Sequence, residues 1–220
     1  HNPDRRHSPA SVVKMMLMLI VAESVKQEAF SLDQNVHITR SASRIGGSQV
    51  YLKQGEIFTL GDLLKTVTIS SANDSAYAIA EHIAGTPEAM VQLMNERAKE
   101  LGLKKTIFTN VHGLPPSAGQ KEDYITAREI SVIAREIVKY PLLLSWGKTV
   151  LDTFRGGKFK LYNTNKLLSQ FSGMDGIKTG YHKNAGFNLV ATAKRDNLRL
   201  ISVVLGAPTQ KGRNDETRRL

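Results

Sequence analysis

The chain contains one long apolar stretch, Ser11-Val12-Val13-Lys14-Met15-Met16-Leu17-Met18-Leu19-Ile20-Val21-Ala22, and Lys14 is its only charged residue. A helix that is apolar on every face is a buried helix, so this stretch predicts one, which we place at residues 9–29. Ser8 and Pro9 predict its start, with Ser8 as the N-cap and Pro9 at the first helical position. The rest of the domain is therefore expected to pack around this helix.

Ser11 and Lys14 form a possible nucleophile and base at the start of that helix. Residues three apart are neighbours on a helix, and burial lowers the pKa of a lysine. A neutral amine beside a hydroxyl is a general base beside a nucleophile. The spacing alone is not specific, because Ser145 and Lys148 share it in a segment that predicts a turn or a short surface helix. Lys14 could also extend its charge from a buried helix into solvent.

Composition sets broad limits on the class of protein. The chain has 220 residues, of which 41% are hydrophobic, which suits one large domain or two small ones. Its longest apolar run is shorter than the roughly 20 residues that span a bilayer, and it lacks a signal-peptide cleavage pattern. The absence of cysteine excludes disulfides, thiol catalysis and cysteine-ligated metals.

The net charge of +10 is compatible with several anionic partners or with a solvated basic surface. The lysines and arginines are scattered, and no zinc finger, RNP motif or basic heptad region is visible. We therefore expect no nucleic-acid partner. Wall polymers and lipid headgroups remain open as anionic partners.

The pattern along the chain changes from helical to alternating near residue 150. Apolar periodicity and capping residues predict helices that begin at Thr59, after Asn73, at Thr86 and at Thr126. Residues 103–125 predict a loop. The later segments predict a hairpin and two strands, at Thr153–Phe159, Gly186–Lys194 and Leu198–Leu205. A helical middle followed by an antiparallel meander indicates an α+β fold.

Two further short motifs can carry chemistry. Ser71-Ala72-Asn73 lies between two predicted helices, where it can present a hydroxyl and a carboxamide, although a helix N-cap is the favoured interpretation from the sequence alone. Lys178-Thr179-Gly180 offers a positive charge, a hydroxyl donor and a backbone that a ligand can approach closely. The alternative for Lys178-Thr179-Gly180 is a polar edge strand that ends in a turn.

Taken in order, the three motifs form the signature of serine penicillin-recognising enzymes. Their flanks resemble the low-molecular-mass D-alanyl-D-alanine carboxypeptidases over nearly the whole chain. The segments that carry this resemblance are Arg6–Met16, Ser71–Ala76, Ala80–Gly85, Val111–Leu114, Asp175–Tyr181 and Ala185–Ala191. The resemblance implies a β-lactamase/DD-peptidase-like α+β fold, in which an antiparallel sheet packs against helices and a helical subdomain.

The resemblance also implies roles in acylation. Ser11 would attack the carbonyl of the penultimate D-alanine, and Lys14 would take its proton. Ser71 would relay a proton to the departing D-alanine. Asn73 would hold the substrate amide and help position Lys14. The water that then hydrolyses the acyl-enzyme needs no metal, and we expect no cofactor.

The resemblance also implies which residues contact the substrate. The backbone N–H groups of Ser11 and Tyr181 would form the oxyanion hole. The implied substrate-binding residues are Lys178, Thr179, Gly180, Tyr181 and Arg213, with Lys178, Thr179 and Arg213 at the terminal carboxylate. His182 departs from the family pattern, which has Thr there, and its imidazole could make substrate binding depend on pH.

The expected partners are peptidoglycan stem peptides and β-lactam antibiotics, outside the cytoplasmic membrane. The family has strands before the nucleophile helix and a helix and second domain after the catalytic region. Residues 1–220 are thus expected to be a catalytic domain that lacks these parts. A signal peptide and a possible membrane-associating segment would lie outside this chain.

Three alternatives remain open at this point. A DD-endopeptidase would use the same chemistry on cross-links. A β-lactamase needs a carboxylate that primes water, for which Glu122 and Asp123 are the candidates between the second and third motifs. A penicillin- or wall-binding module would keep the fold without turnover.

Overall fold

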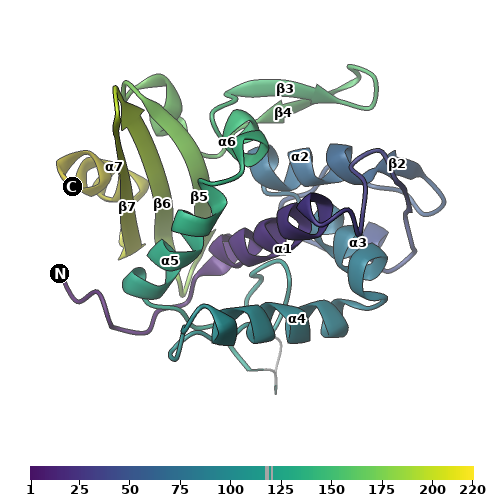
Figure 1. Ribbon diagram of the computed structural model, residues 1–220, viewed down its shortest axis with the longest axis horizontal. Coiled ribbons are helices and arrows are strands. Elements are labelled where there is room, and N and C mark those ends of the chain that lie inside the picture. Colours follow the sequence, from purple (N-terminus) through teal and green to yellow (C-terminus); the bar gives the residue numbers. More distant parts are fainter. Residues whose placement is uncertain (117–118, 120) are drawn as a thin grey trace.

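The protein is described by a computed structural model that covers residues 1–116, 119 and 121–220. A central helix lies between a three-stranded sheet and a group of helices (Figure 1). The helices are α1 (Lys14–Lys26), α2 (Leu60–Ser70), α3 (Asn73–Ala84), α4 (Pro87–Glu100), α5 (Ala127–Ile137), α6 (Pro141–Gly147) and α7 (Gln210–Arg219). The strands are β1 (Asn35–His37), β2 (Ile57–Thr59), β3 (Leu151–Phe154), β4 (Phe159–Tyr162), β5 (Met174–His182), β6 (Gly186–Arg195) and β7 (Leu198–Ala207).

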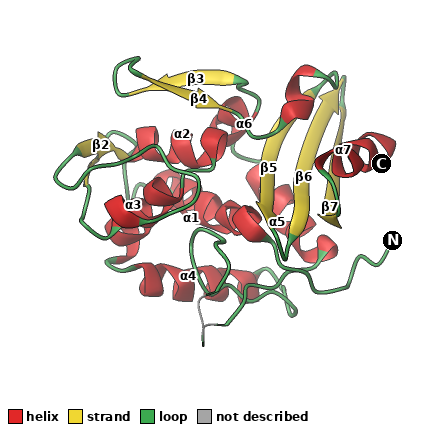
Figure 2. Ribbon diagram, turned by 180° about the vertical axis from the view of Figure 1, so that it is seen from behind, coloured by secondary structure: helices red, strands yellow, loops and turns green. Residues whose placement is uncertain are grey.

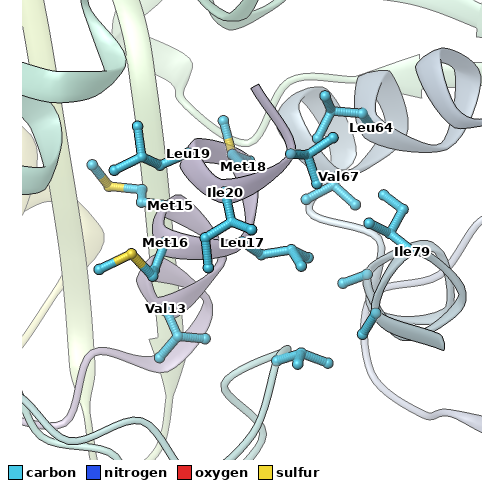
Figure 3. Packing of buried hydrophobic residues seen from close by; sticks show 14 of the residues in the cluster. Val13, Met15, Met16, Leu17, Met18, Leu19, Ile20, Leu64, Val67 and Ile79 are labelled. Atoms are coloured by element: carbon cyan, nitrogen blue, oxygen red, sulfur yellow. The ribbon is translucent and has the colours of Figure 1, made fainter. Parts of the chain in front are cut away.

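Helix α1 is buried on every side, as its sequence predicts. Each side chain from Lys14 to Val21 is buried, and apolar side chains of the surrounding elements pack against it (Figure 3). Residues on all faces are therefore removed from water, and this burial is the main stabilising contribution of the helix.

The predicted ends of this helix are wrong by several residues. A 3₁₀ turn, Ala10–Val13, precedes α1, and α1 ends at Lys26 instead of residue 29. Ser8 is not the N-cap, because its hydroxyl lies 3.2 Å from the imidazole of His182 instead of capping the helix. Ala10 has a φ of 48°, in the left-handed region, so the chain enters α1 through a sharp turn and not through an extended N-cap.

Strands β5, β6 and β7 form an antiparallel sheet in that order. The two predicted strands are confirmed, and the second continues to Ala207. Helix α5 lies on one face of this sheet and α7 on the other, as the two opposite views show (Figures 1 and 2). Strand β5 is the edge strand nearest to α1, and this arrangement places the third motif beside the first.

The helical side contains α2, α3 and α4, with two small two-stranded sheets, β1–β2 and β3–β4, at its margins (Figure 2). The predicted caps are present: the side chains of Thr59, Thr86 and Thr126 each accept a backbone N–H three residues later. The hairpin predicted at Thr153–Phe159 is β3–β4, with Phe154 paired to Phe159. The α+β class is thereby confirmed.

The predicted loop at 103–125 has no helix or named strand in its described part, and residues 117, 118 and 120 lie outside the described residues. An isolated bridge joins Ile107 to Tyr124 and closes the base of this loop. Among the described residues, no helix combines the length and apolar character needed to cross a membrane.

Candidate active site

Ser11 and Lys14 lie side by side at the start of α1. Lys14 Nζ is 2.7 Å from Ser11 Oγ and donates a second hydrogen bond of 2.6 Å to the carbonyl of His112. Ser11 lies in the 3₁₀ turn and Lys14 is the first residue of α1, so the three-residue spacing brings the two side chains together. With a neutral Lys14, one N–H can remain on the His112 carbonyl while the lone pair faces the Ser11 hydroxyl.

Lys14 is buried, with an exposed fraction of 0%. Its pKa lies well below the ordinary lysine value, first because burial desolvates the ammonium and then because Lys178 repels it. Asp123 and Asp74 oppose this shift with their negative charges. The alternative in which Lys14 extends its charge to solvent is wrong. An amine whose pKa is lowered in this way suits a general base.

The loop at 110–114 supplies the carbonyl that holds Lys14. A Cβ at Gly113 would overlap the carbonyl of Ala10 and lie 2.7 Å from the backbone nitrogen of Ser11. Gly113 also has a φ of 78°, which favours glycine. The backbone of the loop therefore packs directly against the Ala10–Val13 turn, and a side chain at position 113 is excluded.

Gly180 performs a similar function on strand β5. A Cβ there would lie 2.5 Å from the Pro9 carbonyl oxygen and 3.1 Å from the Ser11 nitrogen. The glycine thus lets strand β5 approach the backbone of the Ala10–Val13 turn. Tyr181 directly follows this contact in the chain. Its role in an oxyanion hole with Ser11 stays a prediction.

Lys178 and Thr179 precede that contact and are both buried. Lys178 Nζ donates to the Thr179 carbonyl at 3.0 Å, and the Thr179 hydroxyl donates to Thr164 at 2.7 Å. Burial lowers the pKa of Lys178 to about 7. The prediction that this motif lies on an edge strand is confirmed, because β5 is at one side of the sheet. The prediction of a polar, solvated edge is wrong, because the side chains of Lys178 and Thr179 are both buried.

Ser71 and Asn73 lie at the junction of α2 and α3, and the N-cap interpretation is wrong for both. Ser71 is the C-cap of α2 with a φ of 63°, and Asn73 is the first residue of α3 after the N-cap Ala72. The buried Ser71 Oγ and Asn73 Oδ1 have no hydrogen-bond partner among the described residues. Two unsatisfied buried polar atoms at a helix junction suit groups that await a ligand.

Asn73 is tied to the rest of the site through shared neighbours. Its Nδ2 donates to the Gly46 carbonyl at 2.8 Å, and its backbone N–H donates to the Ser48 carbonyl. A Cβ at Gly47 would meet both Asn73 Nδ2 and the side chain of Leu114. The second motif therefore lies beside the loop whose His112 carbonyl holds Lys14.

Tyr181 and His182 point in different directions. The Tyr181 ring is exposed and stacks on Phe187 with the ring centroids 4.2 Å apart. The His182 ring instead accepts the Ala185 N–H at Nδ1, so its Nε2 carries the proton toward Ser8. Burial lowers the pKa of His182, against the charge of Glu122. The expected effect of His182 on substrate binding stays a prediction.

Arg213 is buried in α7, which packs against β6 and β7. Burial lowers the pKa of its guanidinium, which donates to the side chain of Asn214. Within the described contacts, no hydrogen bond joins Arg213 to Lys178 or Thr179. Its predicted contact with a substrate carboxylate stays a prediction.

The second Ser-x-x-Lys pattern has no such setting. Ser145 lies in the seven-residue helix α6 and donates to the Leu142 carbonyl, and Lys148 is exposed. The prediction of a short surface helix is confirmed. The burial of Lys14, and not the spacing, separates the first pattern from the second, whose Lys148 is exposed.

Sequence reasoning gave no role to several residues that shape the site. The His112 carbonyl, the Asn110 side chain and Thr164 all contact predicted site residues directly or through one neighbour. A backbone carbonyl leaves no signal in residue identity, although Gly113 could have indicated a close approach. Among the described residues, no group of three or more histidine, aspartate or glutamate side chains is arranged to hold a metal ion.

A sequence profile of the family described as D-alanyl-D-alanine carboxypeptidase, peptidase family S11, matches residues 1–209. The chain belongs to this D-alanyl-D-alanine carboxypeptidase family. The resemblance inferred from the three motifs is thus confirmed over nearly the whole chain.

Individual members of the carboxypeptidase family agree. The chain is 39% identical to D-alanyl-D-alanine carboxypeptidase DacF of Bacillus subtilis, covering all of this chain and 56% of that protein. Penicillin binding protein 6B from Escherichia coli has a TM-score of 0.92 and 32% identity, with 100% of this chain and 70% of that chain covered. Penicillin-Binding Protein D2 from Listeria monocytogenes, solved in an ampicillin-bound form, has a TM-score of 0.88 and 29% identity, covering 100% and 87%.

The chain spans about half the length of curated relatives that it matches, for example 56% of DacF and 55% of DacC from Escherichia coli. The family match covers residues 1–209, and the structural match to penicillin binding protein 6B covers the whole of this chain.

Proposed function

We propose that this chain is the catalytic domain of a serine D-Ala-D-Ala carboxypeptidase that removes the terminal D-alanine from peptidoglycan stem peptides through an acyl-enzyme on Ser11. The observation that carries the proposal is the buried Lys14 amine, 2.7 Å from Ser11 Oγ, with its pKa well below the usual range because of burial. A hydroxyl beside a neutral amine is an activated nucleophile.

The chemistry proceeds in two halves. Ser11 Oγ attacks the carbonyl carbon of the penultimate D-alanine while its proton moves to Lys14 Nζ. The resulting oxyanion accepts hydrogen bonds from the backbone N–H groups of Ser11 and Tyr181. The D-alanine amine leaves with a proton relayed through Ser71, whose Oγ has no hydrogen-bond partner among the described residues. Water then attacks the ester and releases Ser11.

Substrate orientation comes from the other two motifs. Asn73 offers the substrate amide N–H its carboxamide oxygen, which has no hydrogen-bond partner in the described part of the chain. Lys178 and Thr179, with Arg213 as the further cation, would hold the terminal carboxylate. A β-lactam carries a similar carboxylate beside its reactive amide and would acylate the same serine.

The wider setting follows from the substrate. Peptidoglycan lies outside the cytoplasmic membrane, so we propose an extracytoplasmic protein that is exported by a segment outside this chain. We further propose that residues 1–220 form a catalytic domain that is completed by strands and a second domain in the whole protein. The family and the half-length match to curated relatives support this.

The decisive test is labelling of the full-length protein with a fluorescent penicillin, followed by peptide mapping. We expect one adduct, on the peptide that contains Ser11, and none on the peptide that contains Ser145, which serves as an internal control. The same sample should release D-alanine from a pentapeptide. No adduct in folded protein, or an adduct at another residue, contradicts the proposal.

Two further readouts separate the related activities. Rapid turnover of penicillin without a lasting adduct would indicate a β-lactamase. Cutting of a cross-linked peptide dimer in preference to the pentapeptide would indicate an endopeptidase. An adduct without any D-alanine release would indicate a binding module.

The low pKa of Lys178 predicts a pH-dependent affinity for the substrate carboxylate. Lys178 binds an anion only when it is protonated, and burial lowers its pKa to about 7. Above that pH the charge is lost, so KM should rise by up to about tenfold per pH unit, and binding should take up a proton. KM measured from pH 6 to 9 checks this.

The matched variant for this prediction is Lys178→Arg. A guanidinium stays charged across this range, so its KM should be flat with pH even if its geometry weakens binding at every pH. A wild-type KM that does not rise above pH 7, or an equal rise in both proteins, contradicts the assignment of the carboxylate to Lys178.

A further inference from the structure

Asp123 is a buried carboxylate that the mechanism above does not use. It is 4% exposed and lies in the segment before α5. Its Oδ1 accepts the backbone N–H of Thr109 at 2.6 Å and the Thr109 hydroxyl at 3.0 Å. Its Oδ2 accepts Nδ2 of Asn110 at 2.9 Å. Its oxygens are thus engaged inside the loop, which does not suit a carboxylate that primes a water for deacylation.

Asn110 carries the contact onward to the catalytic loop. Its Oδ1 accepts the backbone N–H of His112 at 3.1 Å and that of Gly113 at 2.5 Å. These two N–H groups flank the His112 carbonyl, which accepts hydrogen bonds from Lys14 at 2.6 Å and from Ser11 at 3.3 Å. A continuous series of hydrogen bonds therefore runs from Asp123 through Asn110 to the nucleophile and its base.

The series requires a group that only accepts hydrogen bonds at position 123. The Asn110 oxygen is occupied by two backbone donors, so its NH₂ group must face Asp123. An ionised carboxylate accepts at both oxygens and so fixes this orientation of the amide. A carboxamide at 123 would place an NH₂ group against either the Asn110 NH₂ or the Thr109 N–H.

The charge of Asp123 also reaches Lys14. Lys178 on β5 lowers the pKa of Lys14, while Asp123 and Asp74 on α3 raise it, all against the larger effect of burial. The His112 imidazole beside it is neutral at neutral pH, since burial and Lys14 lower its pKa to about 4. Asp123 is thus one of two anionic groups that act on the amine.

We propose that Asp123 is a positioning residue for acylation, which holds Asn110 and, through it, the His112 carbonyl that orients the Lys14 amine toward Ser11. The proposal rests on the proposed function, because it concerns the same acylation step. The proposal predicts an effect on the acylation rate and not on substrate binding. The transfer of the Ser11 proton depends on this series of hydrogen bonds, whereas the carboxylate subsite on β5 does not.

The test uses Asp123→Asn in the full-length protein, with stopped-flow acylation by a fluorescent penicillin. We expect the limiting acylation rate to fall about 10- to 100-fold, because the His112 carbonyl and Lys14 lose their alignment. The dissociation constant of the non-covalent complex should stay within about twofold. The acidic limb of the rate profile should move to lower pH, because loss of the negative charge lowers the pKa of Lys14, which acts when deprotonated.

A second variant, Asn110→Ala, breaks the same series but keeps the charge of Asp123. It should show the rate loss without the shift of the acidic limb to lower pH, and it tests the proposal even if Asp123→Asn does not fold. Asp33→Asn is the matched control: Asp33 is exposed, and its carboxylate accepts no hydrogen bond among the described residues, so the acylation rate and the acidic limb should be unchanged.

Each outcome is distinguishable from failure of the proposed function. If the wild-type protein is not acylated at Ser11, the proposed function fails. If the wild type is acylated and folded Asp123→Asn and Asn110→Ala variants react at its rate, the positioning role is overturned. A loss confined to non-covalent binding overturns it as well.

Discussion

Replacement of Lys14 by methionine should lower the rate of acylation at Ser11 by about 10²–10⁴-fold, the usual contribution of a general base. Methionine has a similar length and fills the buried volume, but it offers no lone pair of comparable basicity. The His112 carbonyl then loses its 2.6 Å donor, and the Ser11 hydroxyl, now 3.3 Å from that carbonyl, can take its place.

The same substitution should leave the melting temperature unchanged or raise it. Lys14 is completely buried, and its lowered pKa shows that the fold disfavours the charge the amine carries in water. An apolar side chain avoids that cost. If the unfolding free energy rises by about 1 kcal/mol as a result, the melting temperature of a domain of this size rises by roughly 2–4 °C. Loss of activity with retained stability would mark Lys14 as a functional residue that the fold tolerates at a cost.

Lys148→Met is the matched control, since Lys148 belongs to the second Ser-x-x-Lys pattern and is exposed. Its acylation rate and melting temperature should equal those of the wild type. Acylation of Lys14→Met within tenfold of the wild-type rate would contradict the assignment of Lys14 as the base.

Gly113→Ala should be severely damaging to both stability and acylation. Its φ of 78° alone costs an alanine on the order of 1–3 kcal/mol. The new Cβ would also overlap the Ala10 carbonyl and lie 2.7 Å from the Ser11 nitrogen. The loop must then move away, and because a shift of about 1 Å can reduce a catalytic rate 10²-fold, we expect at least that loss in acylation.

Gly102→Ala separates the backbone effect from the overlap. Gly102 has a φ of 75°, but nothing lies within 4 Å of a Cβ there, and it ends the segment after α4. It should lose about 1 kcal/mol of unfolding free energy with unchanged acylation. Chemical denaturation and penicillin acylation measure both variants, and equal effects in the two would contradict a specific role for the contact between Gly113 and Ser11.

The sequence was informative wherever the signal was local. The apolar run predicted a helix buried on every face, the three Thr caps predicted the starts of α2, α4 and α5, and alternation predicted β6 and β7. Local rules failed at the junctions. Ser8 and Ser71 both have the residue type of an N-cap. In the structure, the Ser8 hydroxyl instead contacts His182, and Ser71 is the left-handed C-cap of α2.

The ordered motifs Ser11–Lys14, Ser71–Asn73 and Lys178–Gly180 indicated a serine penicillin-recognising enzyme, and their flanking segments indicated the family, because residue identity and order are properties of the chain. The setting of Lys14 was decided by tertiary structure. The carbonyl that holds it comes from His112, 98 residues away, and the series from Asp123 reaches that carbonyl through Asn110. Contacts of backbone atoms and buried charges depend on short distances, and only folding brings segments so far apart in sequence to within about 3 Å of each other.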